Sequence, residues 1–209
     1  VCAVLPRGKG FGKEIGAWRD DFIPGLAKLV DAVHRAGAKV ALQLHHAGRE
    51  TFEMAAGGMP EAPSAIPSTV LNQPCEAMSL ERIAAVTDAF ARATVRAKKA
   101  GFDAVELHGA HGYLLMQFLS AHSNRRTDQY GGDFRDRARF MIECLQAARK
   151  AVGDDFPLSI RVSGEECIKD GYTIADMQSI IPDLVAAGAD VINVSFGTHG
   201  SPAVNTDTP

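Results

Sequence analysis

The feature that most constrains the fold is a phrase that occurs three times, in which a helix-type segment ends at Ala-Gly and passes into a short apolar run. The three phrases are AGAKVAL, AGFDAVEL and AGADVINV, which begin at Ala36, Ala100 and Ala187. Glycine suits the left-handed conformation that often ends a helix, and a short aliphatic run is typical of a strand buried on both faces. Repeated helix-to-strand units of this kind predict a parallel sheet with right-handed crossovers.

The rest of the chain fits the same alternation, and we expect the element order β-α-β-α-β-α-β-α-β. Strands are predicted at residues 1–5, 39–44, 103–107, 157–163 and 190–195, and helices at residues 20–37, 80–100, 133–152 and 173–187. Pro182 predicts a kink in the last helix, because proline cannot donate a backbone hydrogen bond. Residues 51–79, which hold four of the ten prolines, predict a long loop with a small hairpin.

Two architectures are compatible with this alternation: a doubly wound open sheet and an eightfold barrel. The phosphate-binding fingerprint of the first, G-x-G-x-x-G between a strand and a helix, is missing, whereas polar residues follow several strands. We therefore predict an α/β fold, a (β/α)8 TIM barrel present as an incomplete fragment of about five strands. Val1 begins within an apolar run and no closing helix follows the last strand, so we expect an excerpt of a longer protein.

Charge and cysteine usage exclude several classes of function. The net charge is −3, and no basic cluster carries interleaved aromatic residues, so a nucleic-acid or membrane-surface partner has no support. No apolar run is long enough to predict a transmembrane helix. The four cysteines are far apart and form no C-x-x-C motif, which predicts reduced thiols in a cytoplasmic protein.

The densest group of chemically active residues follows the predicted strand at residues 103–107. His108, His111 and Tyr113 lie within six residues at its carboxyl end. Two neutral imidazoles can hold a polarised carbonyl oxygen from two directions, and a tyrosine hydroxyl, with a pKa of about 10, suits general-acid catalysis. Spacing alone leaves an equal alternative, in which the histidines satisfy backbone groups and Tyr113 belongs to the core.

Two further polar residues lie near strand ends. We expect Gln43 to point into the barrel mouth and His45 to point outward; an amide there can recognise a ring with donors and acceptors side by side, or it is structural. Arg161 lies within an apolar strand. A buried guanidinium needs an anionic or strongly polar partner because it cannot deprotonate, and either Glu106 or a bound anion meets that need.

The histidines at the barrel mouth also allow a metal site as an alternative. The candidate ligands are His45, His46, His108, His111 and His199. No H-x-H motif ends the first strand and no aspartate follows the last one, so we assign no metal ligand.

Several of these residues stand in motifs that resemble those of the old yellow enzyme family, the flavin-dependent ene-reductases and dienoyl-CoA reductases. Residues 43–49 are similar to Q-L-x-H-x-G-R, residues 101–114 to G-F-D-x-V-E-x-H-x-A-H-G-Y-L, and residues 118–132 to F-L-S-x-x-S-N-x-R-x-D-x-Y-G-G. The motifs occur in the family's order, and the resemblance covers nearly the whole chain. Ala121 departs from the pattern, because the family usually has proline there.

The resemblance implies a TIM barrel that holds FMN noncovalently at its carboxyl-end mouth. Residues 1–209 are then a partial FMN-binding barrel domain that lacks the family's first strand and last two strands. By the same resemblance, Gln43 binds the pyrimidine edge of the flavin and Arg161 lies near its N1 and O2. His108 and His111 hold the carbonyl oxygen of the substrate, and Tyr113 protonates the α-carbon.

The implied activity is that of an NAD(P)H:flavin oxidoreductase, an ene-reductase that passes a hydride from NAD(P)H through the flavin to an activated alkene. The substrate is expected to be an enone or an enoyl or dienoyl thioester, and a homo-oligomer of the full-length protein is left open. The alternatives are a metal-dependent TIM-barrel hydrolase that uses the histidine cluster, and an inactive fragment.

Overall fold

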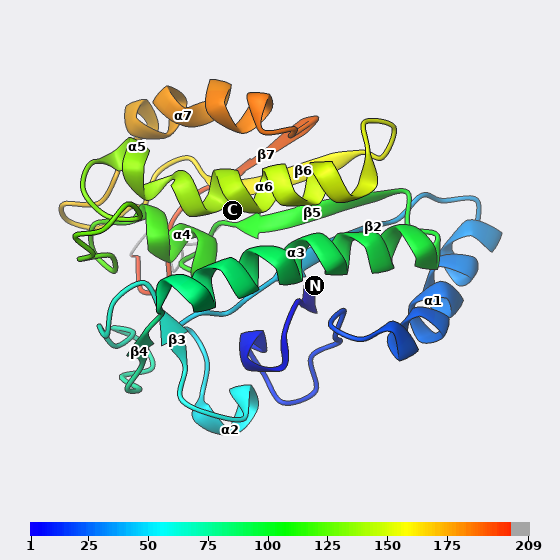
Figure 1. Cartoon of the computed structure of the whole chain (residues 1–209), viewed down its shortest axis with the longest axis horizontal. Coiled ribbons are helices and arrows are strands. Elements are labelled where there is room, and N and C mark those ends of the chain that lie inside the picture. The colour runs from blue at the N-terminus through cyan, green and yellow to red at the C-terminus, as the bar shows by residue number, and fades with distance from the viewer. Residues whose placement is uncertain (202–209) are drawn as a thin grey trace, which may run out of the picture.

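A parallel sheet of five strands forms the centre of the protein in the computed structural model, which describes residues 1–201 (Figure 1). The strands lie in the order β1-β2-β5-β6-β7, and every neighbouring pair is parallel. Their bounds are Cys2–Ala3 for β1, Ala41–His45 for β2, Ala104–Gly109 for β5, Leu158–Ser163 for β6 and Val191–Ser195 for β7. Because the spatial order equals the chain order, each crossover advances to the next strand without the reversal that defines a doubly wound sheet. The predicted barrel-type α/β fold of five strands is confirmed.

The long helices follow the strands as expected. They are α1 (Ile23–Arg35), α3 (Leu80–Ala100), α6 (Arg139–Val152) and α7 (Ile174–Ala186), and α3 and α6 lie side by side over the sheet (Figure 1). Apolar strand residues point toward these helices. Leu44, Leu107 and Ile160 are examples, and all three are fully buried. None of the helices within residues 1–201 is both long enough and apolar enough to span a membrane.

Capping residues explain where two of the helices begin. Ser79 precedes α3 and accepts a hydrogen bond from the backbone N–H of Arg82, and Gly101 ends the helix at a φ of 92°. Thr173 and Asp176 form a reciprocal capping box at the start of α7. Pro182 lies inside α7, which continues through it as a single helix.

Several short elements lie between the long helices and the strands of the sheet, and four of them are helical turns or one-turn helices. They are the 3-10 turns η1 (Pro6–Gly8) and η2 (Asp20–Phe22) and the helices α2 (Glu53–Ala56) and α5 (Phe134–Arg137). The predicted helix at residues 133–152 is thus divided into α5 and α6 at Ala138. The predicted hairpin in the loop is wrong, since the two-residue strands β3 (Glu61–Ala62) and β4 (Glu76–Ala77) pair in parallel.

A further helix, α4 (Leu114–Leu119), was not among the predicted elements. It follows Tyr113 directly, and all six of its residues are buried. A short helix that is apolar on every side shows no amphipathic period, so the sequence pattern does not distinguish it from a loop.

The sheet face opposite the helices is polar, and Glu106 lies at its centre. Glu106 accepts hydrogen bonds from the amide of Gln43 at 2.7 Å, the hydroxyl of Ser159 at 2.9 Å and the amide of Asn193 at 2.9 Å. Because these neutral donors come from β2, β6 and β7, Glu106 links four strands across the barrel interior. It forms no ion pair with Arg161 within residues 1–201.

Candidate active site

Three of the predicted site residues, His108, His111 and Tyr113, lie at or just after the carboxyl end of β5, next to the end of β2. A cavity of about 290 Å³ opens there. It is lined by Val1, Gly10, Phe11, His45, Glu50, Phe52, Leu71, His108, Tyr113 and His199. Polar side chains from three separate segments therefore converge on one space, as is typical of ligand sites in parallel α/β proteins.

His108 forms one wall of this cavity as a neutral hydrogen-bond donor. It is 5% exposed, and its Nδ1 accepts the backbone N–H of Ala110 at 3.3 Å. A backbone N–H can only donate, so the neutral ring carries its proton on Nε2. Burial lowers the pKa of His108 to about 3, and the electrostatic effects of the neighbouring His111 and Arg161 act in the same direction.

His111 lies beside His108 in a constrained backbone conformation. The two rings are perpendicular, with centroids 5.2 Å apart. His111 has a φ of 58°, its backbone N–H donates to Ser163 Oγ at 3.1 Å, and its Nε2 lies 2.7 Å from Ser195 Oγ. Burial, together with the charges of Arg161 and His199, lowers the pKa of His111, so this imidazole is also neutral near pH 7.

Tyr113 completes the predicted group at the start of α4. Its ring centroid lies 4.9 Å from that of His108 and 5.0 Å from that of His199. Burial and the nearby carboxylates of Glu14 and Glu50 raise the pKa of Tyr113. The hydroxyl therefore stays protonated at neutral pH and is available as a proton donor.

His45 belongs to this site, and the prediction that it points outward is wrong. Residues two apart in a strand share a face, so His45 lies on the same side of β2 as Gln43. It is 3% exposed, its ring centroid is 4.3 Å from that of Tyr113, and neither ring nitrogen has a hydrogen-bond partner within residues 1–201. The alternation of side chains along a strand, with a period of two residues, was the sequence signal that could have placed His45 on the same face as Gln43.

His46 points the other way and has a structural role. Its Nδ1 accepts the backbone N–H of Gly48 at 3.1 Å, and its Nε2 lies 3.5 Å from the carboxylate of Glu61. Within residues 1–201, no group of three His, Cys, Asp or Glu side chains is placed to hold a metal ion.

Gln43 and Arg161 lie below the cavity, on the polar face of the sheet. Gln43 donates its amide to Glu106, while Arg161 is the register partner of His108 on the adjacent strand. Arg161 Nε is buried without a hydrogen-bond partner within residues 1–201, and its Nη2 has only a long contact of 3.5 Å to Ser195 Oγ. A partly buried guanidinium with an unpaired Nε fits an anionic or strongly polar ligand.

Gln117 on α4 links the two loops that carry the site. Its amide donates to the carbonyl oxygens of Ala47 at 3.0 Å and Gly112 at 2.7 Å, and its oxygen accepts the backbone N–H of Arg49 at 3.1 Å. Gly48 lies so close that a β-carbon there would be 2.2 Å from this oxygen. Gln117 was not among the predicted site residues, because a glutamine within an apolar run shows no partner in the sequence alone.

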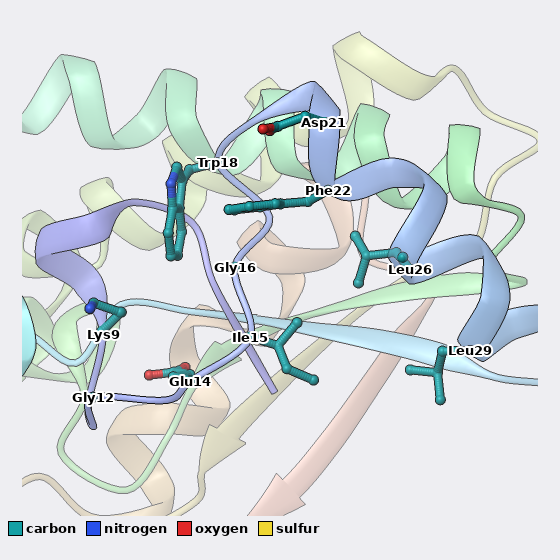
Figure 2. Close-up of a pocket in the computed structure, with 11 residues that line it drawn as sticks. Lys9, Gly12, Glu14, Ile15, Gly16, Trp18, Asp21, Phe22, Leu26 and Leu29 are labelled. Carbon is teal, nitrogen blue, oxygen red and sulfur yellow. The ribbon is translucent and has the colours of Figure 1, made fainter.

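A larger cavity of about 640 Å³ lies between α1 and the loop that precedes it (Figure 2). Its walls include Trp18 and Phe22, whose rings meet edge to face at 5.2 Å. It contains none of the predicted site residues, so the smaller cavity is the candidate active site despite its size. Glu14 lines the larger cavity, and its Oε1 also lies 3.7 Å from Nδ1 of His45.

The neutral state of His108 predicts that acid destabilises the fold. The pKa of His108 falls from 6.5 to about 3, so below pH 6.5 the unfolded chain binds a proton that the folded chain excludes. The free energy of unfolding is therefore highest above pH 6.5 and decreases toward pH 3, with this group contributing up to about 1.4 kcal/mol per pH unit. Glu61, whose pKa is lowered to about 2, adds to the loss below pH 4.5.

Urea unfolding at pH 7.5, 6.0 and 5.0 measures this dependence. We expect His108→Asn to reduce the slope between pH 6.5 and 5, and the same change at the exposed His122 to leave the slope unchanged. Identical slopes in the wild-type protein and His108→Asn would show that other groups cause the acid sensitivity.

The chain matches known proteins over almost its whole length. Residues 1–205 match the model of the NADH:flavin oxidoreductase / NADH oxidase family. The chain is 41% identical over 202 residues to a protein named NADH oxidase from Thermoanaerobacter brockii. The aligned region covers 96% of this chain and 31% of the relative. It is also 41% identical over 192 residues to a metal reductase from Desulforamulus reducens, covering 91% of this chain and 29% of that protein. The chain thus spans about a third of the length of these curated relatives.

Solved structures agree with the sequence matches. A 2-naphthoyl-CoA reductase in complex with 2-naphthoyl-CoA has a TM-score of 0.90 at 33% identity, covering 96% of this chain and 32% of that one. Morphinone reductase in complex with tetrahydroNAD has a TM-score of 0.85 at 30% identity, covering 93% of this chain and 59% of that one. These neighbours are TIM-barrel enzymes, and the five-stranded parallel sheet is the corresponding part of such a barrel.

Proposed function

The chain belongs to the NADH:flavin oxidoreductase / NADH oxidase family, and from that membership we propose that it carries the alkene-reducing site of an FMN-dependent oxidoreductase. In the proposed reaction a hydride from NAD(P)H reaches the C=C bond of an activated alkene by way of the flavin. The observation that carries this proposal is that His108 and Tyr113 line one cavity, while the neutral imidazole of His111 packs against His108 with ring centroids 5.2 Å apart.

The domain proposal follows from the number of strands. An eightfold barrel needs three strands more than the five found in residues 1–201. We propose that residues 1–209 are part of an FMN-binding barrel domain, in which the family's first strand and last two strands complete the wall. Residues 202–209 of that domain lie outside the described part of the chain.

Family membership implies FMN as the cofactor and a reduced nicotinamide as the reductant. The residues present fit such a group, because Arg161 keeps a buried Nε without a partner in the described part of the chain. Arg161 and Gln43 are the residues that would hold it. When bound, FMN supplies the hydride chemistry, while the protein provides orientation and charge.

The two histidines would activate the substrate by binding its carbonyl oxygen. Each ring is neutral and can present one N–H group, and hydrogen bonds to an oxygen that gains negative charge withdraw electrons from the conjugated C=C bond. Because both donors lie on or just after β5, they are positioned before the substrate arrives. This preorganisation favours the charge that develops in the transition state.

Tyr113 would then provide the proton. Its raised pKa keeps the O–H bond intact at neutral pH, and it lies against His45 and His108 at the wall of the cavity. In this assignment the α-carbon receives the tyrosine proton after hydride addition at the β-carbon.

The supported substrate class is an alkene conjugated to a carbonyl group, either an enone or a thioester. Among the related structures, the first binds 2-naphthoyl-CoA, a thioester, and morphinone reductase is named for morphinone. The two classes share the carbonyl oxygen that the histidine pair is proposed to hold.

A visible spectrum of the full-length protein under anaerobic conditions tests this function. We expect a yellow protein that bleaches when NADH or NADPH is added and regains its colour when a conjugated enone or an enoyl thioester follows. The matched saturated ketone is the control and should leave the protein bleached. A colourless protein that takes up no added FMN contradicts the cofactor, and a flavin that neither alkene reoxidises contradicts the substrate class.

A further inference from the structure

We propose that Ser163 and Ser195 act as a two-serine clamp on His111, in which Ser163 holds its backbone and Ser195 places its ring proton on Nδ1. Both are positioning residues, because they act through His111 and not on the substrate. The proposal rests on the function proposed above, in which His111 donates a hydrogen bond to the substrate carbonyl.

The backbone half of the clamp explains how His111 keeps an unfavourable conformation. Its φ of 58° lies in the left-handed region, which residues with a β-carbon adopt at a cost. Ser163 is fully buried and donates its hydroxyl proton to the carbonyl oxygen of Gly197 at 2.7 Å. With the proton committed there, the oxygen of Ser163 accepts the backbone N–H of His111 at 3.1 Å. The backbone bend is therefore tied to the end of β6.

The ring half of the clamp determines which nitrogen carries the proton. Nε2 of His111 lies 2.7 Å from Ser195 Oγ, and Arg161 Nη2 approaches the same oxygen at 3.5 Å. A guanidinium can only donate, so the serine oxygen accepts on that side, and in the proposed clamp its single hydrogen is directed toward His111. Nε2 is then the acceptor, and the neutral imidazole carries its proton on Nδ1.

The clamp is rigid because both serines are the last residues of paired strands. Ser163 ends β6 and Ser195 ends β7, and the two are direct register partners. The hydroxyl of Tyr172 also donates to the carbonyl oxygen of Ser163 at 3.0 Å, which secures this end of β6. Side chains on strands hold a neighbouring group in position more precisely than side chains on loops do.

The clamp gives the two histidines of the site different proton positions. His108 accepts a backbone N–H at Nδ1 and therefore donates through Nε2. In the proposed clamp His111 accepts the Ser195 hydroxyl at Nε2, 2.7 Å away, and donates through Nδ1. Each imidazole thus keeps one N–H for the shared carbonyl oxygen while its other nitrogen is held by the protein.

Nitrogen NMR of protein labelled with 15N-histidine tests the tautomer without any turnover. The signals of His111 are identified by their loss in His111→Gln. We expect a protonated Nδ1 and an unprotonated Nε2 in the wild-type protein and in Ser195→Thr, which keeps the hydroxyl. In Ser195→Ala the proton should move, partly or wholly, to Nε2. Ser179→Ala, which removes an exposed hydroxyl from α7, is the control and should leave the pattern unchanged.

Kinetics and hydrogen exchange complete the test. Ser195→Ala should slow alkene reduction roughly tenfold, the effect of one lost hydrogen bond, and Ser195→Thr should restore most of the rate. Ser163→Ala should speed hydrogen exchange at the His111 amide. A wild-type His111 with its proton on Nε2, or a tautomer that Ser195→Ala does not change, overturns the proposal. Absence of alkene reduction in the wild-type protein instead contradicts the proposed function, because the tautomer is read independently.

Discussion

Replacement of Tyr113 by phenylalanine is expected to slow alkene reduction by roughly 10²–10⁴-fold, the range for loss of a general acid. Reduction of the flavin by NAD(P)H should remain nearly unchanged, because that half-reaction needs no proton from the tyrosine. The ring and its contacts with His45 and His108 are kept in this variant, so only the hydroxyl is tested. Stopped-flow absorbance measures the two half-reactions separately.

Tyr130→Phe provides the matched control for this experiment. Its hydroxyl donates to Glu143 on α6 at 2.8 Å, away from the cavity, so both half-reactions should keep their wild-type rates. Equal losses in both half-reactions of Tyr113→Phe would show that Tyr113 supports the structure and does not supply the proton.

Replacement of His108 by leucine is expected to slow alkene reduction by roughly 10²–10³-fold, the cost of removing one donor to a developing oxyanion. Leucine occupies much of the imidazole volume but offers no N–H group. The wild-type rate should also show no titration of His108 between pH 5 and 8, because its pKa is about 3 and the ring is a neutral donor throughout. Rate measurements at saturating alkene across this pH range test both statements.

His122→Leu is the control for the loss of a histidine, since His122 is exposed and lies outside the cavity. If His108→Leu reduced the alkene at a rate within a few-fold of the wild-type rate, His108 would not be a hydrogen-bond donor to the substrate. A wild-type rate that falls below pH 6.5, with His108→Leu removing that fall, would show instead that the ring titrates near its ordinary pKa.

Much of the architecture follows from local sequence signals. The helix from Leu80 to Ala100 was predicted with its observed bounds, because Ser79 caps its start and Gly101 ends it in the left-handed conformation. Strand positions were correct to within a few residues, since short apolar runs after glycine have few other interpretations. His108, His111 and Tyr113 were predicted together as candidate site residues for a similar reason, because all three lie within six residues at the end of one strand.

Local sequence signals did not predict contacts between segments that are far apart in the chain. Glu106 was one of two partners considered for Arg161, beside a bound anion, yet three neutral donors from other strands occupy it. His111 and Ser195 are 84 residues apart in the sequence, and their hydrogen bond depends on the position of β7 relative to β5. Such pairings are set by the register of the whole sheet, and no window along the chain contains that information.

The sequence by itself determined the order of elements, the parallel sheet and the candidate site residues at the end of β5, because periodicity, caps and strand ends are local properties of the chain. Only the tertiary structure decided that His45 enters the cavity, that Gln117 joins the two loops, and that two serines hold His111. These contacts form when the strands align side by side, which brings residues far apart in the chain within hydrogen-bonding distance.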